Sequence, residues 1–142
     1  MTDAHSSTAF ADEHALAKLM IEFALAADEA EHIDAVTALF THDGSFTVGG
    51  ESHCGADDIG RYLQGARDGG FAGPDANTRH LVTNCTVTLH EDHEASGRSE
   101  WMLVGSAHGE NSAPVILASG QYHDRYRRVD GRWFISERKV LS

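Results

Sequence analysis

The sequence predicts an α+β fold in which helices come first and a mostly antiparallel sheet follows. In the first half of the 142-residue chain, apolar residues recur at three- and four-residue spacings, which is typical of amphipathic helices. After residue 76, four long segments are rich in β-branched and aromatic residues and are separated by polar turns. Helices grouped before strands indicate that the helices pack against a single curved sheet.

The first predicted helix covers residues 9–27, and residues 1–8 are expected to form a flexible terminus. Its apolar stripe consists of Leu16, Leu19, Met20, Phe23 and Ala27. Asp28 follows directly, although a carboxylate at the C-terminal end of a helix faces the negative end of the helix dipole. Asp28 is therefore poorly placed to stabilise this helix, and it could serve another group. The alternative is that Asp28 or Glu29 caps the next helix.

Short elements and a glycine-rich loop connect the first helix to the sheet. The predicted elements are a helix over residues 33–41, a hairpin with strands at 45–48 and 51–54, and a helix over 55–66. Residues 68–76 contain three glycines and a proline, so they are predicted to form a loop. Phe71 in this loop could cover the mouth of a pocket, and a plain exposed connection is the alternative.

Four long strands complete the predicted fold. They cover residues 77–89, 95–106, 115–129 and 132–141, with hairpin turns at 109–112 and 130–131. Alternate residues of a strand share a face, so Arg138 on the last strand is expected on the same face as Phe134 and Ser136. Its guanidinium could bind an oxyanion or leaving group, and an ordinary salt bridge to Glu100 or Glu137 is the alternative.

The strand over 77–89 carries the side chain around which we predict a site. Alternation places Leu81, Cys85, Val87 and Leu89 on a core face. It places His80 on the opposite face, together with Val82, Asn84, Thr86 and Thr88. An imidazole beside apolar and amide groups is typical of a pocket wall. We interpret His80 as a general base, because a neutral imidazole accepts a proton near pH 7, and Asp28 as the carboxylate that holds it.

Composition narrows the functional classes. A net charge of -11 and the lack of a basic stripe argue against nucleic-acid binding. No apolar run reaches the roughly 20 residues of a membrane helix, and no secretory signal is evident, so a cytoplasmic protein is expected. Cys54 and Cys85 are expected to be reduced. The histidines do not have the spacing of a metal site, and we predict neither a metal nor a cofactor.

The order of elements and a set of short motifs resemble the SnoaL-like branch of the nuclear transport factor 2-like superfamily. The motifs are Asp28 at the end of the first helix, residues 38–44 (ALFTHDG), 55–59 (GADDI), 78–80 (TRH), 120–124 (GQYHD) and 130–133 (DGRW). The resemblance implies a single domain over residues 9–142. It also implies a cone-shaped α+β barrel, with three N-terminal helices on a strongly curved sheet that encloses a cavity. Family members also imply a homo-oligomer, as a dimer or trimer.

The resemblance also implies roles for individual residues. In dehydratase and dehydrochlorinase members, an aspartate that ends the first helix pairs with a histidine that begins the third strand, and Asp28 and His80 match these positions. Arg138 matches an arginine that helps hold the departing anion in the dehydrochlorinase. Phe23 stands where those enzymes have Lys or Tyr, so no leaving-group acid is implied there.

The predicted substrate-binding residues are Tyr122, Trp101, Phe23, Val82, Asn84, Leu103 and Phe71. As ordinary core residues, the aromatic and aliphatic members of this set would look the same in the sequence. Beside Arg138, the candidates for stabilising developing negative charge are Tyr122 and Asn84, with His123 in reserve.

Together these features predict a cofactor-independent lyase or isomerase. The predicted substrate is a small, hydrophobic, oxygenated compound that is aromatic or polycyclic, and the predicted reaction is an elimination such as dehydration. One alternative is a non-catalytic binding module like the beta subunit of a ring-hydroxylating dioxygenase. An epoxide hydrolase or polyketide cyclase of the same fold is another.

Overall fold

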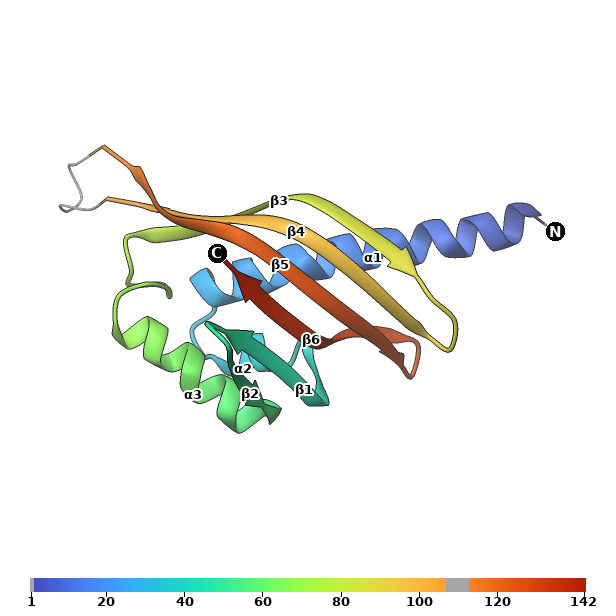
Figure 1. The fold of residues 1–142 in the computed structure, drawn as a ribbon, viewed down its shortest axis with the longest axis horizontal. Helices are drawn as coiled ribbons and strands as arrows, with labels where there is room; N and C mark the ends of the chain where they lie inside the picture. Colours follow the sequence, from blue (N-terminus) through green and yellow to red (C-terminus); the bar gives the residue numbers. More distant parts are fainter. Residues whose placement is uncertain (1, 107–112) are drawn as a thin grey trace.

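A long N-terminal helix lies across one face of a six-stranded sheet (Figure 1). The computed structural model describes residues 2–106 and 113–142. Its elements are α1 (Thr2–Glu29), α2 (Asp34–Thr37), β1 (Phe40–Val48), β2 (Glu51–Cys54), α3 (Gly55–Asp68), β3 (Thr78–Leu89), β4 (Glu94–Gly105), β5 (Val115–Val129) and β6 (Arg132–Leu141). The α+β prediction is confirmed.

The strands follow the order β2-β1-β6-β5-β4-β3 across the sheet. Neighbouring strands are antiparallel except β1 and β6, which are parallel. A parallel pair needs a long connection, and all the elements from β2 to β5 lie between these two strands in the chain. Figure 1 shows α1 passing behind the long strands β3, β4 and β5, whereas the short strands β1 and β2 lie beside α3. The strands curve around the inner side chains, so α1 and α3 meet one concave face.

The core lies between α1 and this inner face of the sheet. The buried side chains of α1 include Leu16, Met20 and Phe23, and they pack with Tyr126 and Ile135 of the sheet. The helix α1 lies very close to the sheet at Gly97 of β4. A Cβ atom added at this position would overlap the methyl group of Met20. The same atom would lie 3.0 Å from the Thr86 carbonyl oxygen. The absence of a side chain at position 97 therefore lets the helix pack directly on the sheet.

A β-bulge changes which side chains of β3 face inward. The register between β3 and β4 shifts between Thr83 and Thr86, and Asn84 has a left-handed φ of 55°. His80 and Val82 are half-buried before the bulge, and the odd-numbered residues Cys85, Val87 and Leu89 are half-buried after it. The core face predicted for Cys85, Val87 and Leu89 is confirmed. The prediction was wrong in placing Leu81 with them and His80 and Val82 opposite, because one extra residue reverses the alternation. Leu81 is 45% exposed on the outer face.

A second shift reverses the alternation in β6. Tyr126 pairs with Ile135 and Arg125 pairs with Glu137, which leaves Ser136 as the extra residue. Trp133, Ile135 and Arg138 are consequently all buried. The prediction that Arg138 shares a face with Phe134 and Ser136 was wrong for this reason.

Most element boundaries agree with the sequence analysis, and the differences have local causes. The helix α1 begins at Thr2, earlier than predicted, and ends at Glu29. The second helix is a single turn, because Phe40 already pairs with Ile135 in the sheet and the Ile135 N–H donates to the Leu39 carbonyl. Both β5 and β6 have the predicted bounds. The turn predicted at residues 109–112 lies outside the described residues.

Candidate active site

A cavity of about 260 Å³ lies between α1, α3 and the inner face of the sheet. Its wall is mostly apolar and aromatic. Six of the predicted residues line it: Phe23, Phe71, His80, Trp101, Leu103 and Tyr122. Others come from β1 and α3, which the sequence analysis did not connect with a site: Phe46, Val48, Tyr62, Leu63, Ala66 and Arg67. Their contribution depends on the parallel pairing of β1 with β6, which no local sequence signal predicts.

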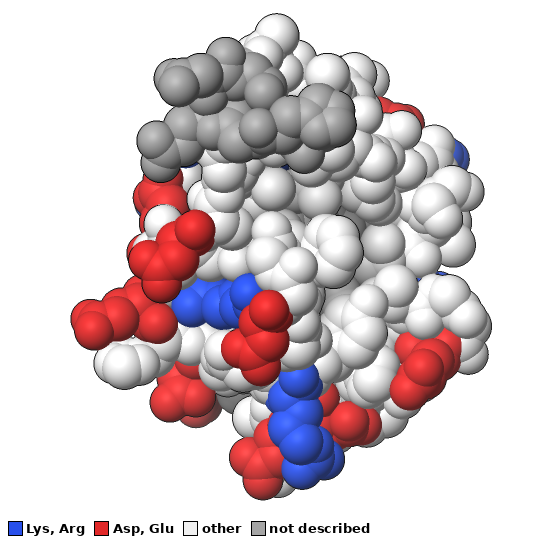
Figure 2. Space-filling model, turned by 90° about the vertical axis from the view of Figure 1, so that its left-hand side faces the viewer, with Lys and Arg blue, Asp and Glu red and all other residues white. Residues whose placement is uncertain are grey.

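The end of the molecule at the loop between α3 and β3 carries few charges at its centre. Figure 2 views the molecule from this side and shows a mostly uncharged central surface, with Asp and Glu side chains and some Lys or Arg side chains around it. Phe71 belongs to this loop, lines the cavity and is 59% exposed. An uncharged ligand would therefore meet few charges on this surface and an exposed aromatic ring at the cavity.

Asp28 and His80 are in direct contact at the wall of the cavity. The Oδ1 atom of Asp28 lies 2.8 Å from Nδ1 of His80, and Oδ2 accepts the backbone N–H of His80 at 2.7 Å. Asp28 is only 8% exposed, and the next helix has Ile33 at its N-cap without a side-chain cap. The predicted pairing is therefore present, and the capping alternative is not. Because an ionised carboxylate only accepts hydrogen bonds, the neutral ring carries its proton on Nδ1, and Nε2 keeps a free lone pair.

Tyr122 supplies a hydroxyl group to the same cavity. Its ring stacks on Trp101 with centroids 6.0 Å apart and meets Phe23 edge-on at 6.2 Å. Burial raises the pKa of Tyr122 to about 12, and the nearby Arg138 guanidinium opposes this rise. The hydroxyl therefore stays protonated at neutral pH. It makes no hydrogen bond to another residue in the described part of the chain, so it is free to donate to a ligand.

Arg138 is fully buried behind the aromatic wall. Its Nε and Nη2 atoms donate to Oδ1 and Oδ2 of Asp124, each at 2.8 Å, and Asp124 also accepts from the Tyr126 hydroxyl at 2.6 Å. Arg138 does form an ion pair, but the alternative that named Glu100 or Glu137 as its partner was wrong, because the shift in β6 turns Arg138 inward to Asp124.

The guanidinium of Arg138 lies between two rings of the pocket wall. It is 4.0 Å from the centroid of the Tyr122 ring and 4.6 Å from that of Phe23. These rings separate it from the cavity, which it does not line. Arg138 can therefore act on a ligand through Tyr122, by cation–π and charge effects on the phenol, and not by direct contact.

The structure does not bring three further candidates into the cavity. Val82 faces inward but lies beyond the residues that line the cavity. Asn84 is exposed because it forms the bulge. His123 lies on the outer face of the sheet, where its Nε2 atom is 3.0 Å from Oε1 of Gln121.

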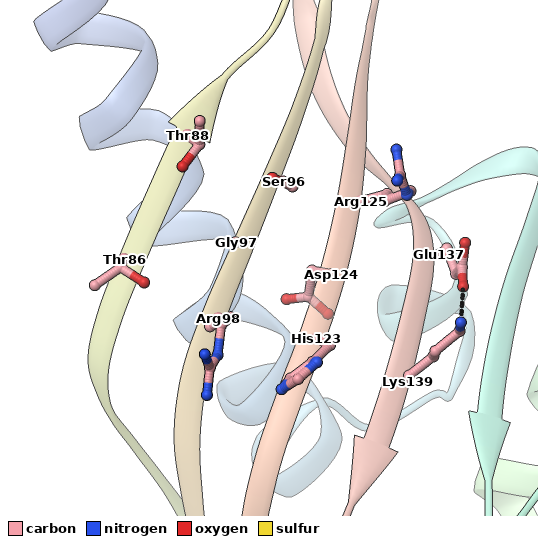
Figure 3. A pocket seen from close by; sticks show the side chains of 10 residues that line it. All are labelled: Thr86, Thr88, Ser96, Gly97, Arg98, His123, Asp124, Arg125, Glu137 and Lys139. Atoms are coloured by element: carbon pink, nitrogen blue, oxygen red, sulfur yellow. Dashed lines mark ion pairs between the residues drawn. The ribbon is translucent and has the colours of Figure 1, made fainter.

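A second hollow, of about 310 Å³, lies over this outer face. Figure 3 shows side chains from β3, β4, β5 and β6 around it, including Arg98, His123, Arg125 and the ion pair of Glu137 with Lys139. Gln121 accepts from Arg98 at 3.2 Å and also contacts His123. This hollow is open and polar, and its histidine is engaged by a neutral amide. It therefore lacks the sheltered base that the inner cavity has.

In the part of the chain whose side chains the structure describes, residues 8–106 and 113–142, no three His, Cys, Asp or Glu side chains are grouped as metal ligands would be. Both cysteines are free thiols. None of the described helices has the length and apolar character that crossing a membrane requires.

Comparison with known proteins agrees with this fold. A model of the SnoaL-like domain matches residues 8–139. No curated protein matches the chain. An NTF2-like protein with a cystatin-like fold from Novosphingobium aromaticivorans is 16% identical, with a TM-score of 0.82, over 99% of this chain and 88% of that one.

Two further solved structures bear on the family. A protein from Novosphingobium aromaticivorans named "Putative Scytalone Dehydratase" is 25% identical, with a TM-score of 0.73, over 99% of this chain and 87% of its own. LinA is 20% identical, with a TM-score of 0.75, over 99% of this chain and 90% of its own. Since the family match covers nearly the whole sequence, this chain belongs to the SnoaL-like domain family.

Proposed function

We propose that this protein is a cofactor-independent lyase or isomerase that removes a proton from a small hydrophobic, oxygenated substrate. The observation that carries the proposal is the contact between Asp28 and His80 at the wall of an apolar cavity. A carboxylate on Nδ1 fixes the tautomer of the ring and stabilises the imidazolium that forms when Nε2 takes a proton. No Ser or Cys is hydrogen-bonded to His80 in the described residues, so proton transfer is favoured over nucleophilic catalysis.

In a dehydration, each group has one task. Nε2 of His80 takes a proton from a carbon of the substrate, and the electron pair of that C–H bond forms a C=C bond. The neighbouring C–O bond breaks, and its oxygen leaves as water with a proton from the Tyr122 hydroxyl. His80 then returns its proton to Tyr122 directly or through solvent. Arg138 lies 4.0 Å from the Tyr122 ring and lowers the cost of transient negative charge on that phenol.

The cavity limits the size of the substrate. Its volume is about 260 Å³, and an apolar cavity of roughly 150 Å³ can hold benzene. Phe23, Phe46, Tyr62, Phe71, Trp101 and Tyr122 give it a largely aromatic wall. A flat compound of one or two rings therefore fits better than a larger polycyclic one.

The structural relative named for scytalone dehydratase makes dehydration the first reaction to test. Non-catalytic assembly is the competing proposal. Phe23 supports it, because this residue presents an apolar ring to the cavity at a position where catalytic relatives are expected to carry an acid.

The test compares turnover of hydroxylated one- and two-ring ketones by wild type, His80→Gln, Asp28→Asn and His123→Gln. His123 is the matched control, because it lies on the outer face. We expect the first two variants to lose about 10²- to 10⁴-fold in kcat and the control to resemble wild type. Equal turnover in all four folded proteins would contradict the proposal. An inactive wild type that co-purifies with a larger catalytic chain would support assembly.

A further inference from the structure

One side chain outside the Asp28–His80 pair holds the backbone on both sides of Asp28. Arg67 lies in the last turn of α3, and its Nη2 atom donates to the carbonyl oxygens of Ala26 at 3.1 Å and Ala27 at 3.0 Å. Its Nη1 atom donates to the Glu31 carbonyl at 3.2 Å. The last carbonyls of a helix have few partners in the helix itself. The Ala26 carbonyl also accepts the Ala30 N–H at 3.0 Å, so Arg67 is a second donor there. Arg67 therefore caps α1 from a different helix.

The charge of Arg67 also suits this place. The C-terminal end of a helix carries a partial charge of roughly -0.5, which disfavours a carboxylate such as Asp28 beside it. A guanidinium on the terminal carbonyls offsets that partial charge. If a water molecule or a backbone N–H bound these carbonyls in place of Arg67, no positive charge from α3 would lie near Asp28.

The side chain of Arg67 is confined by the loop that carries Phe71. A Cβ atom at Gly73 would lie 3.2 Å from Cγ of Arg67, so the loop backbone packs directly on the arginine stem. Phe71 is held by its own contacts: its N–H donates to the Ala66 carbonyl at 2.9 Å, and its carbonyl accepts from the Thr78 hydroxyl at 3.1 Å. Arg67 thus sits where the end of α1, the pocket loop and the start of β3 meet.

We propose that Arg67 is the positioning residue of the Asp28–His80 pair. By fixing three carbonyls around Asp28, it sets the end of α1 at the place from which both carboxylate oxygens reach His80. Its effect on catalysis rests on the proposed function, whereas its effect on the hydrogen bond between the two side chains does not. Arg67 also lines the cavity and packs against the loop at Gly73, so the pocket wall and the alignment of the base share this side chain.

The test uses Arg67→Met, which keeps an apolar stem, Arg67→Lys, which keeps the charge without the fork, and Arg61→Met. Arg61 lies on the same helix with a 76% exposed side chain and is the matched control. The first measurement is the NMR signal of the Nδ1 proton of His80, which Asp28→Asn should abolish. We expect this signal to be lost in Arg67→Met, partly retained in Arg67→Lys and unchanged in Arg61→Met.

The second measurement is a double-mutant cycle on turnover. Arg67→Met should lower kcat by about 10- to 100-fold, with little change in KM, in the wild-type background. It should cost little more in the Asp28→Asn background, whereas a merely structural role would cost the same in both.

An unchanged Nδ1 signal in Arg67→Met, or additive losses in the cycle, would overturn the proposal. If Arg67→Met does not fold, a full Nδ1 signal in folded Arg67→Lys would overturn it. A protein without turnover but with the predicted NMR changes would refute the enzymatic proposal alone.

Discussion

At the scale of single residues, the hydroxyl of Tyr122 and its aromatic ring have different roles. The ring makes the contacts with Trp101, Phe23 and Arg138, and the hydroxyl makes none with the described residues. We therefore expect Tyr122→Phe to keep the fold and lose about 10²- to 10⁴-fold in kcat, the usual contribution of a proton donor. Steady-state kinetics beside a thermal melt would check this. Unchanged kcat would remove Tyr122 as the acid.

The raised pKa of Tyr122 predicts how stability depends on alkaline pH. In the unfolded chain the phenol ionises near pH 10, and in the folded protein burial raises its pKa to about 12. The folded state therefore binds more protons in this window, and stability falls as pH rises from about 10 through about 12. Urea unfolding at pH 9 and 11 should show a smaller loss for Tyr122→Phe than for wild type. Equal losses would mean that this phenol ionises alike in both states.

At the scale of elements, the hairpin turn between β5 and β6 could be predicted from its residues, whereas the β-bulges in β3 and β6 could not. Asp130 and Gly131 both have positive φ angles and join β5 to β6, which have their predicted bounds. The shift at Asn84 depends on how β3 fits against β4, so the sequence alternation alone led to wrong faces. Asp28 and His80 could still be predicted, because a carboxylate at the wrong end of a helix is a local signal. Arg67 could not, because a cation in the last turn of a helix is ordinary there.

The bulge itself makes a prediction about β3. Because Asn84 has a φ of 55°, a β-branched residue there should cost about 1–3 kcal/mol in free energy of unfolding. Asn84→Val should therefore destabilise the protein, and Asn84→Gly should be close to neutral. Thr83→Val, at the neighbouring exposed position, is the control. Denaturant unfolding measures all three, and equal stability of the two valine variants would contradict the bulge.

The contact between α1 and β4 gives a second prediction at this scale. Gly97→Ala would push a methyl group against Met20, the Thr86 carbonyl and Tyr126, and should destabilise by about 1–3 kcal/mol. Gly65→Ala in α3 is the control, because nothing lies within 4 Å of the added atom and Ala is the better helix former there. Chemical denaturation should thus give opposite signs for the two substitutions.

At the scale of the whole molecule, one buried ion pair joins the core to the cavity. Arg138 and Asp124 have no exposed side-chain surface, and their neighbours Phe23 and Tyr122 belong to both the core and the pocket wall. Removing one partner of a buried pair leaves the other charge uncompensated, which costs about 3–5 kcal/mol. We therefore expect Arg138→Met to be strongly destabilised.

Replacing both charges should recover much of this loss, because Arg138→Met with Asp124→Leu leaves no buried charge. Arg127→Met is the control, since the two side chains of its ion pair with Asp43 lie 3.3 Å apart on the exposed surface and should contribute little to stability. Denaturant unfolding of wild type and these three variants tests the pair as a source of stability.

Turnover tests the second role of the pair, which is to hold a cation behind the Tyr122 ring. The double variant should remain slow even when its stability is restored, because Tyr122 would have lost that cation. A double variant as active as wild type would show that the pair serves the core alone.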